Sequence, residues 1–274
     1  EEWREGDITG FDRKTGEWTT IKPQKAWGGE VKELCEDGPY LWIATETGGI
    51  RRFHLASGTW TSFHEGNGLL MNYINDRALK ADERYLWVGT PGGISRYDKV
   101  NLSWTNYTKQ DTLAANRIQA VVADDRYVWC GTREGISQYD KVYGTWRRLQ
   151  KSPSAPGKSK YVNALAVDDR YLWIGTREGP YRYDKITDKW DGFRIWHGLP
   201  GVDISAVVVD GYDVWMGTNG GICKFPRMSD NLSDWVSYTS GVSITSEVMS
   251  KEYAATLVSN EVWCMDADKD DIWV

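Results

Sequence analysis

The chain is short of the residues from which most metal sites and covalent catalytic sites are built. Its 274 residues include three histidines and four cysteines, and no apolar stretch approaches the roughly 20 residues of a membrane-spanning helix. The cysteines follow no C-x-x-C or similar metal-ligand spacing, and they are Cys35, Cys130, Cys223 and Cys264. We interpret them as small buried hydrophobic residues. The sequence therefore predicts no metal site, no cofactor and no membrane span in this chain.

An excess of positive charge is also missing. Lysine and arginine together number 33, against 39 aspartates and glutamates, which gives a net charge of −6. A protein that binds nucleic acid through its phosphates needs a basic face, so the charge balance argues against a nucleic-acid partner. The apolar share of 41% is ordinary for a globular protein, and the length allows one large domain or two small ones.

Tryptophan and glycine, in contrast, are abundant, with 16 and 28 residues. Most of the tryptophans belong to a repeated phrase, of which DDRYVWCGTREG from Asp124 and DDRYLWIGTREG from Asp168 are two copies. The spacing between copies is mostly 42 to 45 residues, and the first tryptophan of the phrase is Trp42, Trp87, Trp129, Trp173, Trp215 and, in a shortened copy, Trp273. A second tryptophan in each repeat is Trp18, Trp60, Trp104, Trp146, Trp190 and Trp235. The chain thus contains six repeats.

Each repeat has the pattern of four short strands separated by turn residues. In the third repeat these strands are RIQAVVA, YVWCGT, ISQYD and TWRRL. A repeat of about 40 to 45 residues with four strands is typical of a propeller blade. We therefore predict an all-β, six-bladed β-propeller with four antiparallel strands per blade, forming a single domain over residues 1–274. The expected blades are 30–63, 73–107, 117–149, 161–193, 203–239, and 261–274 together with 8–20, so that N- and C-terminal strands share one blade and close the ring.

The repeat also resembles a known family. The phrase LWIGT-x-x-G-[IP]-x-R-Y-D, followed in places by a GL segment as in EGNGLL and HGLP, is similar to the two-component-regulator propeller repeat. Propellers of that family form extracytoplasmic sensor regions of bacterial hybrid histidine kinases and bind ligands that are often derived from carbohydrate. The resemblance covers nearly the whole chain. It implies a ligand-binding, sensor-type propeller and a periplasmic or secreted location.

The first candidate site is a ring of residues at the entrance of strand one, where we expect the mouth of the propeller channel. These positions vary between repeats that otherwise keep the same packing residues, as positions selected by a ligand would. Counted 12 and 10 residues back from each phrase tryptophan, they are Glu30 and Lys32, Asn75 and Arg77, Arg117 and Gln119, Tyr161 and Asn163, Asp203 and Ser205, and Glu261 and Trp263. Their mixed chemistry suits a polar ligand such as a saccharide. The alternative is ordinary variation at solvated strand ends.

Two further features are expected on the same face. The GTREG loops carry Arg133 and Arg177 in adjacent repeats, and two guanidinium groups suit a carboxylate or a sulfate. An exposed salt-bridge pattern is the alternative. The connection over residues 240–258 is longer than the fold requires, and its segment 246–257 has helical character. This insertion is interpreted as a lid, a partner-binding surface or a tolerated insertion.

An enzyme is the less favoured interpretation. No G-x-S-x-G motif is present, and the three histidines (His54, His64 and His197) are predicted to be turn or loop residues. The aspartates of the YDK turns are predicted to bind nearby backbone N–H groups. We therefore assign no catalytic residue and no metal ligand. The favoured function is a non-catalytic, ligand-binding sensor propeller; the alternatives are a protein-interaction scaffold that uses the insertion and rim loops, and a polysaccharide lyase or hydrolase that uses carboxylates such as Glu30, Asp203 and Glu261.

Overall fold

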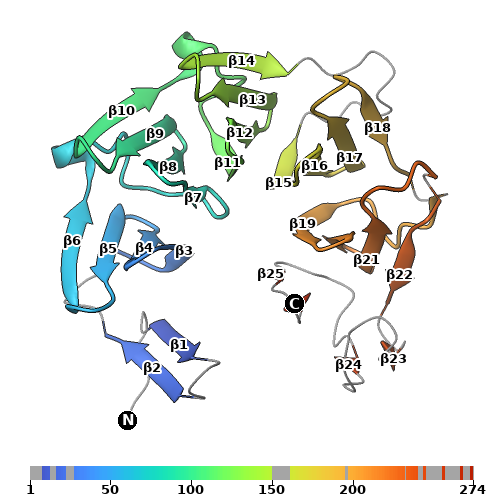
Figure 1. The fold of residues 1–274 in the computed structure, drawn as a ribbon, viewed down its shortest axis with the longest axis horizontal. Coiled ribbons are helices and arrows are strands. Elements are labelled where there is room, and N and C mark those ends of the chain that lie inside the picture. The colour runs from blue at the N-terminus through green and yellow to red at the C-terminus, as the bar shows by residue number, and fades with distance from the viewer. Residues whose placement is uncertain are drawn as a thin grey trace. The chain divides into compact units, whose positions relative to one another are not determined.

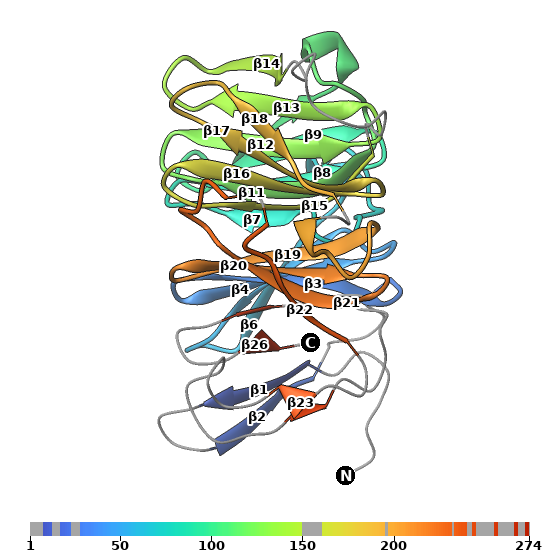
Figure 2. The same ribbon diagram turned by 90° about the vertical axis from the view of Figure 1, so that its right-hand side faces the viewer.

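The structure is a computed structural model, and it is built from β-strands. It describes residues 8–12, 17–22, 28–149, 161–194, 197–231, 233–239, 243–244, 255–256, 266–267 and 272–273. Five four-stranded antiparallel sheets, here called sheets 1 to 5, follow one another along the chain (Figures 1 and 2). Between them lie short 3₁₀ helices such as η1 (Glu65–Asn67) and η2 (Lys109–Asp111). No helix in these ranges is long and apolar enough to cross a membrane.

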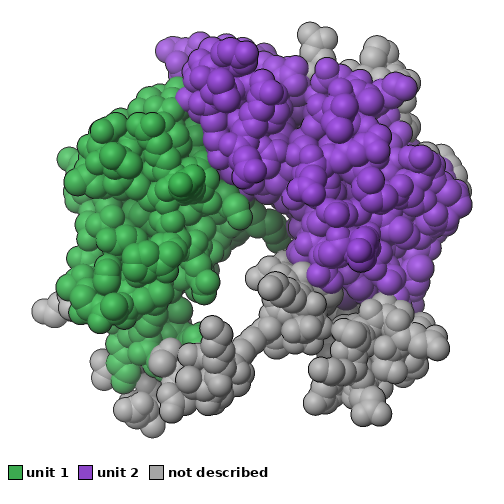
Figure 3. All heavy atoms as spheres, viewed as in Figure 1, with its two compact units in different colours: residues 1–108, 116–118 green, residues 109–115, 119–274 purple. Residues whose placement is uncertain are grey.

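The chain divides into two compact units, coloured separately in Figure 3. Unit 1 consists of residues 1–108 and 116–118, and unit 2 of residues 109–115 and 119–274. In unit 1, sheet 1 comprises β3 (Val31–Asp37), β4 (Tyr40–Thr45), β5 (Ile50–His54) and β6 (Thr59–Phe63). Sheet 2 comprises β7 (Leu79–Ala81), β8 (Tyr85–Thr90), β9 (Gly93–Asp98) and β10 (Ser103–Tyr107).

Unit 2 contains the other three four-stranded sheets. Sheet 3 comprises β11 (Ile118–Ala123), whose first residue belongs to unit 1, β12 (Tyr127–Thr132), β13 (Gly135–Asp140) and β14 (Thr145–Leu149). Sheet 4 comprises β15 (Val162–Val167), β16 (Tyr171–Thr176), β17 (Gly179–Asp184) and β18 (Trp190–Gly192). Sheet 5 comprises β19 (Ile204–Asp210), β20 (Asp213–Thr218), β21 (Gly221–Pro226) and β22 (Val236–Tyr238). The prediction of four antiparallel strands per repeat is therefore confirmed in these sheets.

Two hairpins near the chain ends contain the strands expected for the sixth blade. They are β1 (Ile8–Asp12) with β2 (Glu17–Ile21), and β25 (Asp266–Ala267) with β26 (Ile272–Trp273). Each hairpin is a two-stranded sheet of its own among the described residues. Their union in one shared blade stays a prediction.

The inserted segment before the last hairpin contains a short strand pair. Strand β23 (Ser243–Ile244) pairs antiparallel with β24 (Ala255–Thr256). The helix predicted over residues 246–257 is therefore wrong at Ala255 and Thr256, where pairing with β23 satisfies backbone groups that a helix would bond internally. The other residues of the predicted helix lie outside the described residues.

The second strand of each repeat is buried on both faces, and this explains the repeated phrase. In sheet 4 all six residues of β16 are buried, and the phrase tryptophan Trp173 is completely inaccessible to solvent. Trp173 lies in one apolar cluster with residues of sheet 5 such as Ile204 and Phe225. A Cβ atom on Gly175 would come within 2.7 Å of Ile204, so the glycine of W-x-G-T lets the two sheets approach.

The turns between strands are held by aspartates, as predicted for the aspartates of the YDK turns. The Asp168 carboxylate accepts hydrogen bonds from the backbone N–H groups of Arg170 and Tyr171 and from Nε1 of Trp173. The YDK aspartate of the same sheet, Asp184, accepts from the N–H groups of Ile186 and Thr187. Asp98 and Asp140 make the equivalent backbone contacts in sheets 2 and 3.

His64 and His197 lie in connections between strands, as predicted, whereas His54, predicted in a turn, is the last residue of strand β5. Nδ1 of His54 accepts a hydrogen bond from the backbone N–H of Ser57, three residues further along the turn. His64 caps η1, and His197 accepts a hydrogen bond from the backbone N–H of Arg194. These ring nitrogens therefore stabilise local backbone conformations.

A lysine in the turn after strand three joins neighbouring sheets. In unit 2, Lys185 Nζ lies 2.6 Å from Asp124 Oδ2 of sheet 3 and 2.6 Å from the carbonyl oxygen of Asp168. In unit 1, Lys99 makes the same pair of contacts, with Asp37 Oδ1 and the carbonyl oxygen of Asp82, both at 2.6 Å. The side chain of Lys185 is 9% exposed, so water screens this ion pair weakly.

Replacing this lysine should destabilise unit 2. We expect Lys185→Met to lower the free energy of unfolding by about 2 kcal/mol, because it leaves the partly buried carboxylate of Asp124 without its cation. The exposed Lys189 of the same turn is the matched control, and Lys189→Met should change it by less than about 0.5 kcal/mol. Urea unfolding measures both changes. Equal effects of the two substitutions would contradict a stabilising role for the ion pair between Lys185 and Asp124.

Candidate ligand-binding site

The predicted residues at the entrance of strand one include several that lie at irregularities in the β-sheet. The pairing register of strands one and two shifts between Val31 and Glu33, between Val162 and Ala164, and between Ile204 and Ala206. The residues inside these shifts are Lys32, Asn163 and Ser205. Such bulges redirect side chains and are frequent beside binding sites.

The side chains at these positions make local contacts. Lys32 Nζ donates a hydrogen bond to Glu30 Oε2 at 3.1 Å, and this bond raises the pKa of Lys32 above its ordinary value. Asn163 Nδ2 donates to Asp203 Oδ1 at 3.0 Å and to the carbonyl oxygen of Ile204 at 3.1 Å. Ser205 Oγ donates to the carbonyl oxygen of Gly217 at 3.2 Å. Asn163 and Asp203 are therefore brought together, from sheets 4 and 5.

In sheet 2 the structure distinguishes the two residues found by counting along the sequence. Asn75 is buried, and its Nδ2 donates to the carbonyl oxygen of Ile118, the first residue of β11. Asn163 makes the same contact with Ile204, the first residue of β19, so Asn75 is its structural equivalent. Arg77, which counting had aligned with Asn163, lies in a turn before β7 with φ of 56°. Two additional residues before β7 account for the offset.

The remaining predicted residues are distributed as follows. Arg117 is exposed immediately before β11, and Gln119 is half-buried on β11 itself. Glu261 and Trp263, the residues expected in the sixth blade, lie outside the described residues.

Three predicted residues form a compact group, here called the Arg–Tyr–Arg cluster: Arg133, Tyr161 and Arg177. The guanidinium carbon of Arg133 lies 4.9 Å from the ring centroid of Tyr161, and that of Arg177 lies 4.7 Å from it. Both distances are within the range of cation–π contacts. Tyr161 precedes β15, whereas the arginines come from the turns that end β12 and β16. Three separate segments of unit 2 therefore meet at one aromatic ring.

Each arginine of the cluster is held by a tight turn of fixed geometry. Thr132 Oγ1 accepts a hydrogen bond from the backbone N–H of Glu134 and donates to the carbonyl oxygen of Gly135. Thr176 makes the same two bonds around Arg177. The turn needs glycine at its end, since Gly135 has φ of 126°, a conformation that favours glycine.

The charges of this cluster are available for a ligand. Arg133 and Arg177 are exposed, and within the described residues no ion pair or hydrogen bond engages either guanidinium. Glu134, beside Arg133, is paired with Lys109 at 3.0 Å and so is not the counter-ion of Arg133. Two guanidinium forks held against one half-buried ring can together bind a carboxylate or a sulfate.

A half-buried acid on β3 was not among the predicted site residues. Glu33 occupies the strand-one position at which Ala120, Ala164 and Ala206 stand in other sheets. Its Oε2 accepts a hydrogen bond from the backbone N–H of Leu79 in sheet 2, at 2.7 Å. Burial disfavours the carboxylate and raises the pKa of Glu33 to about 8. Comparing the repeats position by position would have shown this residue as the exception among small side chains.

The structure is similar to those of known extracellular domains. The extracellular domain of the putative hybrid two-component system BT3049 from B. thetaiotaomicron matches 96% of this chain, with a TM-score of 0.71 and 17% sequence identity. The extracellular domain of BT4673 from the same organism matches 93%, with a TM-score of 0.71 and 18% identity. The computationally designed Ika8 protein matches 98%, with a TM-score of 0.62 and 15% identity. No protein-family model and no curated protein sequence matches the chain.

The chain has an all-β, six-bladed propeller fold. The resemblance drawn from the W-x-G-T phrase is thereby confirmed at the level of the fold. The propeller spans about a third of the length of the BT3049 and BT4673 domains, with 35% and 32% of those chains covered. At these identities the similarity concerns the fold, and the site residues must be argued from this chain.

The stability of the propeller should depend on pH through Glu33. Its pKa is about 8 in the folded state and 4.5 in a model peptide, so the folded state holds one more proton than the unfolded state between these values. The free energy of unfolding should therefore fall as pH rises through this window, by up to about 1.4 kcal/mol per pH unit. Glu33→Gln should flatten this dependence, and the exposed Glu36→Gln should not. Urea unfolding at several pH values measures the slopes; parallel slopes for wild type and Glu33→Gln would rule out the raised pKa.

Proposed function

We propose that this propeller is a non-catalytic, ligand-binding module of the sensor type, which recognises a polar small molecule such as a saccharide. The Arg–Tyr–Arg cluster carries the proposal, because it offers two exposed guanidinium groups and an aromatic ring at one place. The strand-one residues around it, including Asn163 and Asp203, supply further hydrogen-bonding groups in unit 2.

The chemistry of the cluster favours a saccharide that carries an acidic group. A carboxylate or sulfate can accept paired hydrogen bonds from the arginines, which are strong because both partners are charged. Tyr161 holds both guanidinium groups against its ring, which keeps the two positive charges together where an acidic group can bind. A rigid turn on either side limits the entropy lost when the ligand binds.

The setting of the similar propellers supports a sensor role and a location outside the cytoplasm. BT3049 and BT4673 are described as extracellular domains of putative hybrid two-component systems. By analogy, we place this propeller in an extracytoplasmic sensor, where ligand binding rather than turnover is the output.

Binding of uronic acids tests the proposal. Galacturonic and glucuronic acid differ from galactose and glucose in one carboxylate, so these two pairs isolate the contribution of the negative charge. We expect each acid to bind at least about tenfold more tightly than its neutral counterpart by calorimetric titration. Arg133→Gln and Arg177→Gln should each remove most of this preference, since each deletes a charge-assisted hydrogen bond that contributes about 1.5 to 3 kcal/mol.

Lys189→Gln is the control variant, because it removes one positive charge at the other end of β17 from Arg177. It should leave the affinity for both acids unchanged. Equal affinity for acids and neutral sugars, or equal effects of Lys189→Gln and Arg177→Gln, would refute a specific site at the cluster.

A further inference from the structure

A cation in the third strand covers the aromatic residues of the second strand in four of the five sheets. These cations are Arg52, Arg96, Arg182 and Lys224. Arg52 lies 4.6 Å from the ring centroid of Tyr40, and Arg182 lies 4.6 Å from that of Tyr171. Lys224 lies 5.6 Å from the ring of the phrase residue Trp215. The repeat therefore normally fills the space above these rings with its own side chain.

In sheets 2 and 4 the tyrosine is contacted by two arginines. Tyr85 has Arg84 at 5.1 Å and Arg96 at 4.7 Å from its ring centroid. Tyr171 has Arg170 at 5.0 Å and Arg182 at 4.6 Å. One arginine of each pair comes from the turn before strand two, and the other comes from strand three.

Sheet 3 departs from this arrangement. Its tyrosine, Tyr127, has Arg126 of the preceding turn at 4.9 Å, but the third strand carries Gln138 in place of the second arginine. In the described ranges no second guanidinium lies over the ring of Tyr127. The shorter, uncharged glutamine thus leaves part of this space open.

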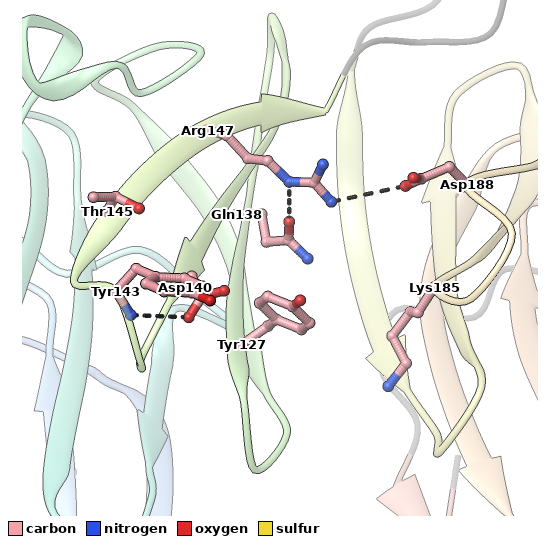
Figure 4. Close-up of a pocket in the computed structure, with 8 residues that line it drawn as sticks. All are labelled: Tyr127, Gln138, Asp140, Tyr143, Thr145, Arg147, Lys185 and Asp188. Carbon is pink, nitrogen blue, oxygen red and sulfur yellow. Dashed lines mark hydrogen bonds and ion pairs between the residues drawn. The ribbon is translucent and has the colours of Figure 1, made fainter.

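An open cleft of about 430 Å³ lies at this place, between sheets 3 and 4 of unit 2. Figure 4 shows Tyr127 and Gln138 on one side of it and Lys185 and Asp188 on the other. Arg147 of β14 reaches across its edge, with Nη2 at 3.8 Å from Asp188 Oδ1. A volume of this size is sufficient for a small ligand.

Gln138 gives the cleft a fixed donor. The residue is 2% exposed, and its Oε1 accepts a hydrogen bond from Arg147 Nε. This bond orients the amide, whose nitrogen points toward the open space in Figure 4. Among the described residues no hydrogen bond engages that nitrogen, so it can donate to a ligand or to water in the cleft.

The charged groups of the cleft are already paired. Asp140 is held by Arg126 at 3.3 Å, and Lys185 is held by Asp124 at 2.6 Å. Arg147 faces Asp188, so the rim presents one positive and one negative group. Because the charges balance, the cleft offers no net electrostatic attraction to a strongly cationic or strongly anionic ligand. A neutral molecule with several hydroxyl groups can form hydrogen bonds with the Gln138 amide, the Arg147 guanidinium and the Asp188 carboxylate.

We propose that this cleft is a second ligand site, which binds a neutral saccharide ring. The apolar face of the sugar lies on the ring of Tyr127, Gln138 donates to one hydroxyl group, and Arg147 and Asp188 bind others at the rim. The site is separate from the Arg–Tyr–Arg cluster: β13 begins beside Arg133 and ends at Asp140 in the cleft. The inference therefore goes beyond the proposed function and does not depend on it.

The test restores the repeat pattern in sheet 3. Gln138 pairs with Arg147 across strands three and four, at the positions of Arg96 and Thr105 in sheet 2. The double variant Gln138→Arg/Arg147→Thr should therefore place an arginine over Tyr127 and close the cleft. Galactose, glucose, lactose and cellobiose are the probes, and binding is followed by calorimetry and by the NMR signal of the Gln138 side-chain amide.

At least one of the four sugars should shift that amide signal in the wild type, and the double variant should bind it at least about tenfold more weakly. Gln138→Met, which keeps the length of the side chain but lacks its amide, should also weaken binding and covers the case in which the double variant does not fold. Arg133→Gln, at the other site, should leave the neutral sugar bound. The proposal is overturned if no sugar shifts the amide signal, or if Gln138→Met binds the sugar as tightly as the wild type.

Discussion

The burial of one strand on both faces is the constraint on which the structure depends. In each sheet the strand of the W-x-G-T phrase is covered on both sides, and Trp42, Trp87, Trp129 and Trp173 have no exposed surface. Two-sided burial requires apolar residues at successive positions and a glycine where the next sheet comes close. The phrase therefore returns in sheets 2 to 5, and sheet 1 keeps it with Ala44 at the glycine position. Turn aspartates then hold the turns within sheets, and the lysine after strand three joins sheet 1 to sheet 2 in unit 1 and sheet 3 to sheet 4 in unit 2.

This constraint leaves few positions free for chemistry. Strand centres are committed to packing, so ligand-binding groups can lie in the turns, at strand entrances, or where a repeat departs from its pattern. The Arg–Tyr–Arg cluster belongs to the first two classes, since Arg133 and Arg177 occupy turn positions and Tyr161 a strand entrance. Gln138 and Glu33 belong to the third class. In each of these cases the strands keep their pairing, and only the chemistry of one side-chain position differs.

The two departures have opposite physical effects. Glu33 adds a carboxyl group where other sheets have alanine, and a backbone hydrogen bond from the neighbouring sheet partly offsets the cost of its burial. Gln138 removes a charge and several atoms where other sheets have arginine or lysine, and a cleft opens above Tyr127. Both substitutions can be recognised by comparing repeats. Their consequences depend on which groups of the adjacent sheet face them.

The sequence by itself determined the fold class, the four strands of each repeat and the roles of the turn aspartates, because these follow from local periodicity and turn chemistry. The sequence also assigned Arg133 and Arg177 to the GTREG turns of adjacent repeats. Only the tertiary structure decided that Tyr161 lies between these arginines and that Asn75, rather than Arg77, matches Asn163. Counting along the chain cannot detect a bulge or a two-residue insertion, and contacts between separate segments depend on how the sheets pack, not on sequence spacing.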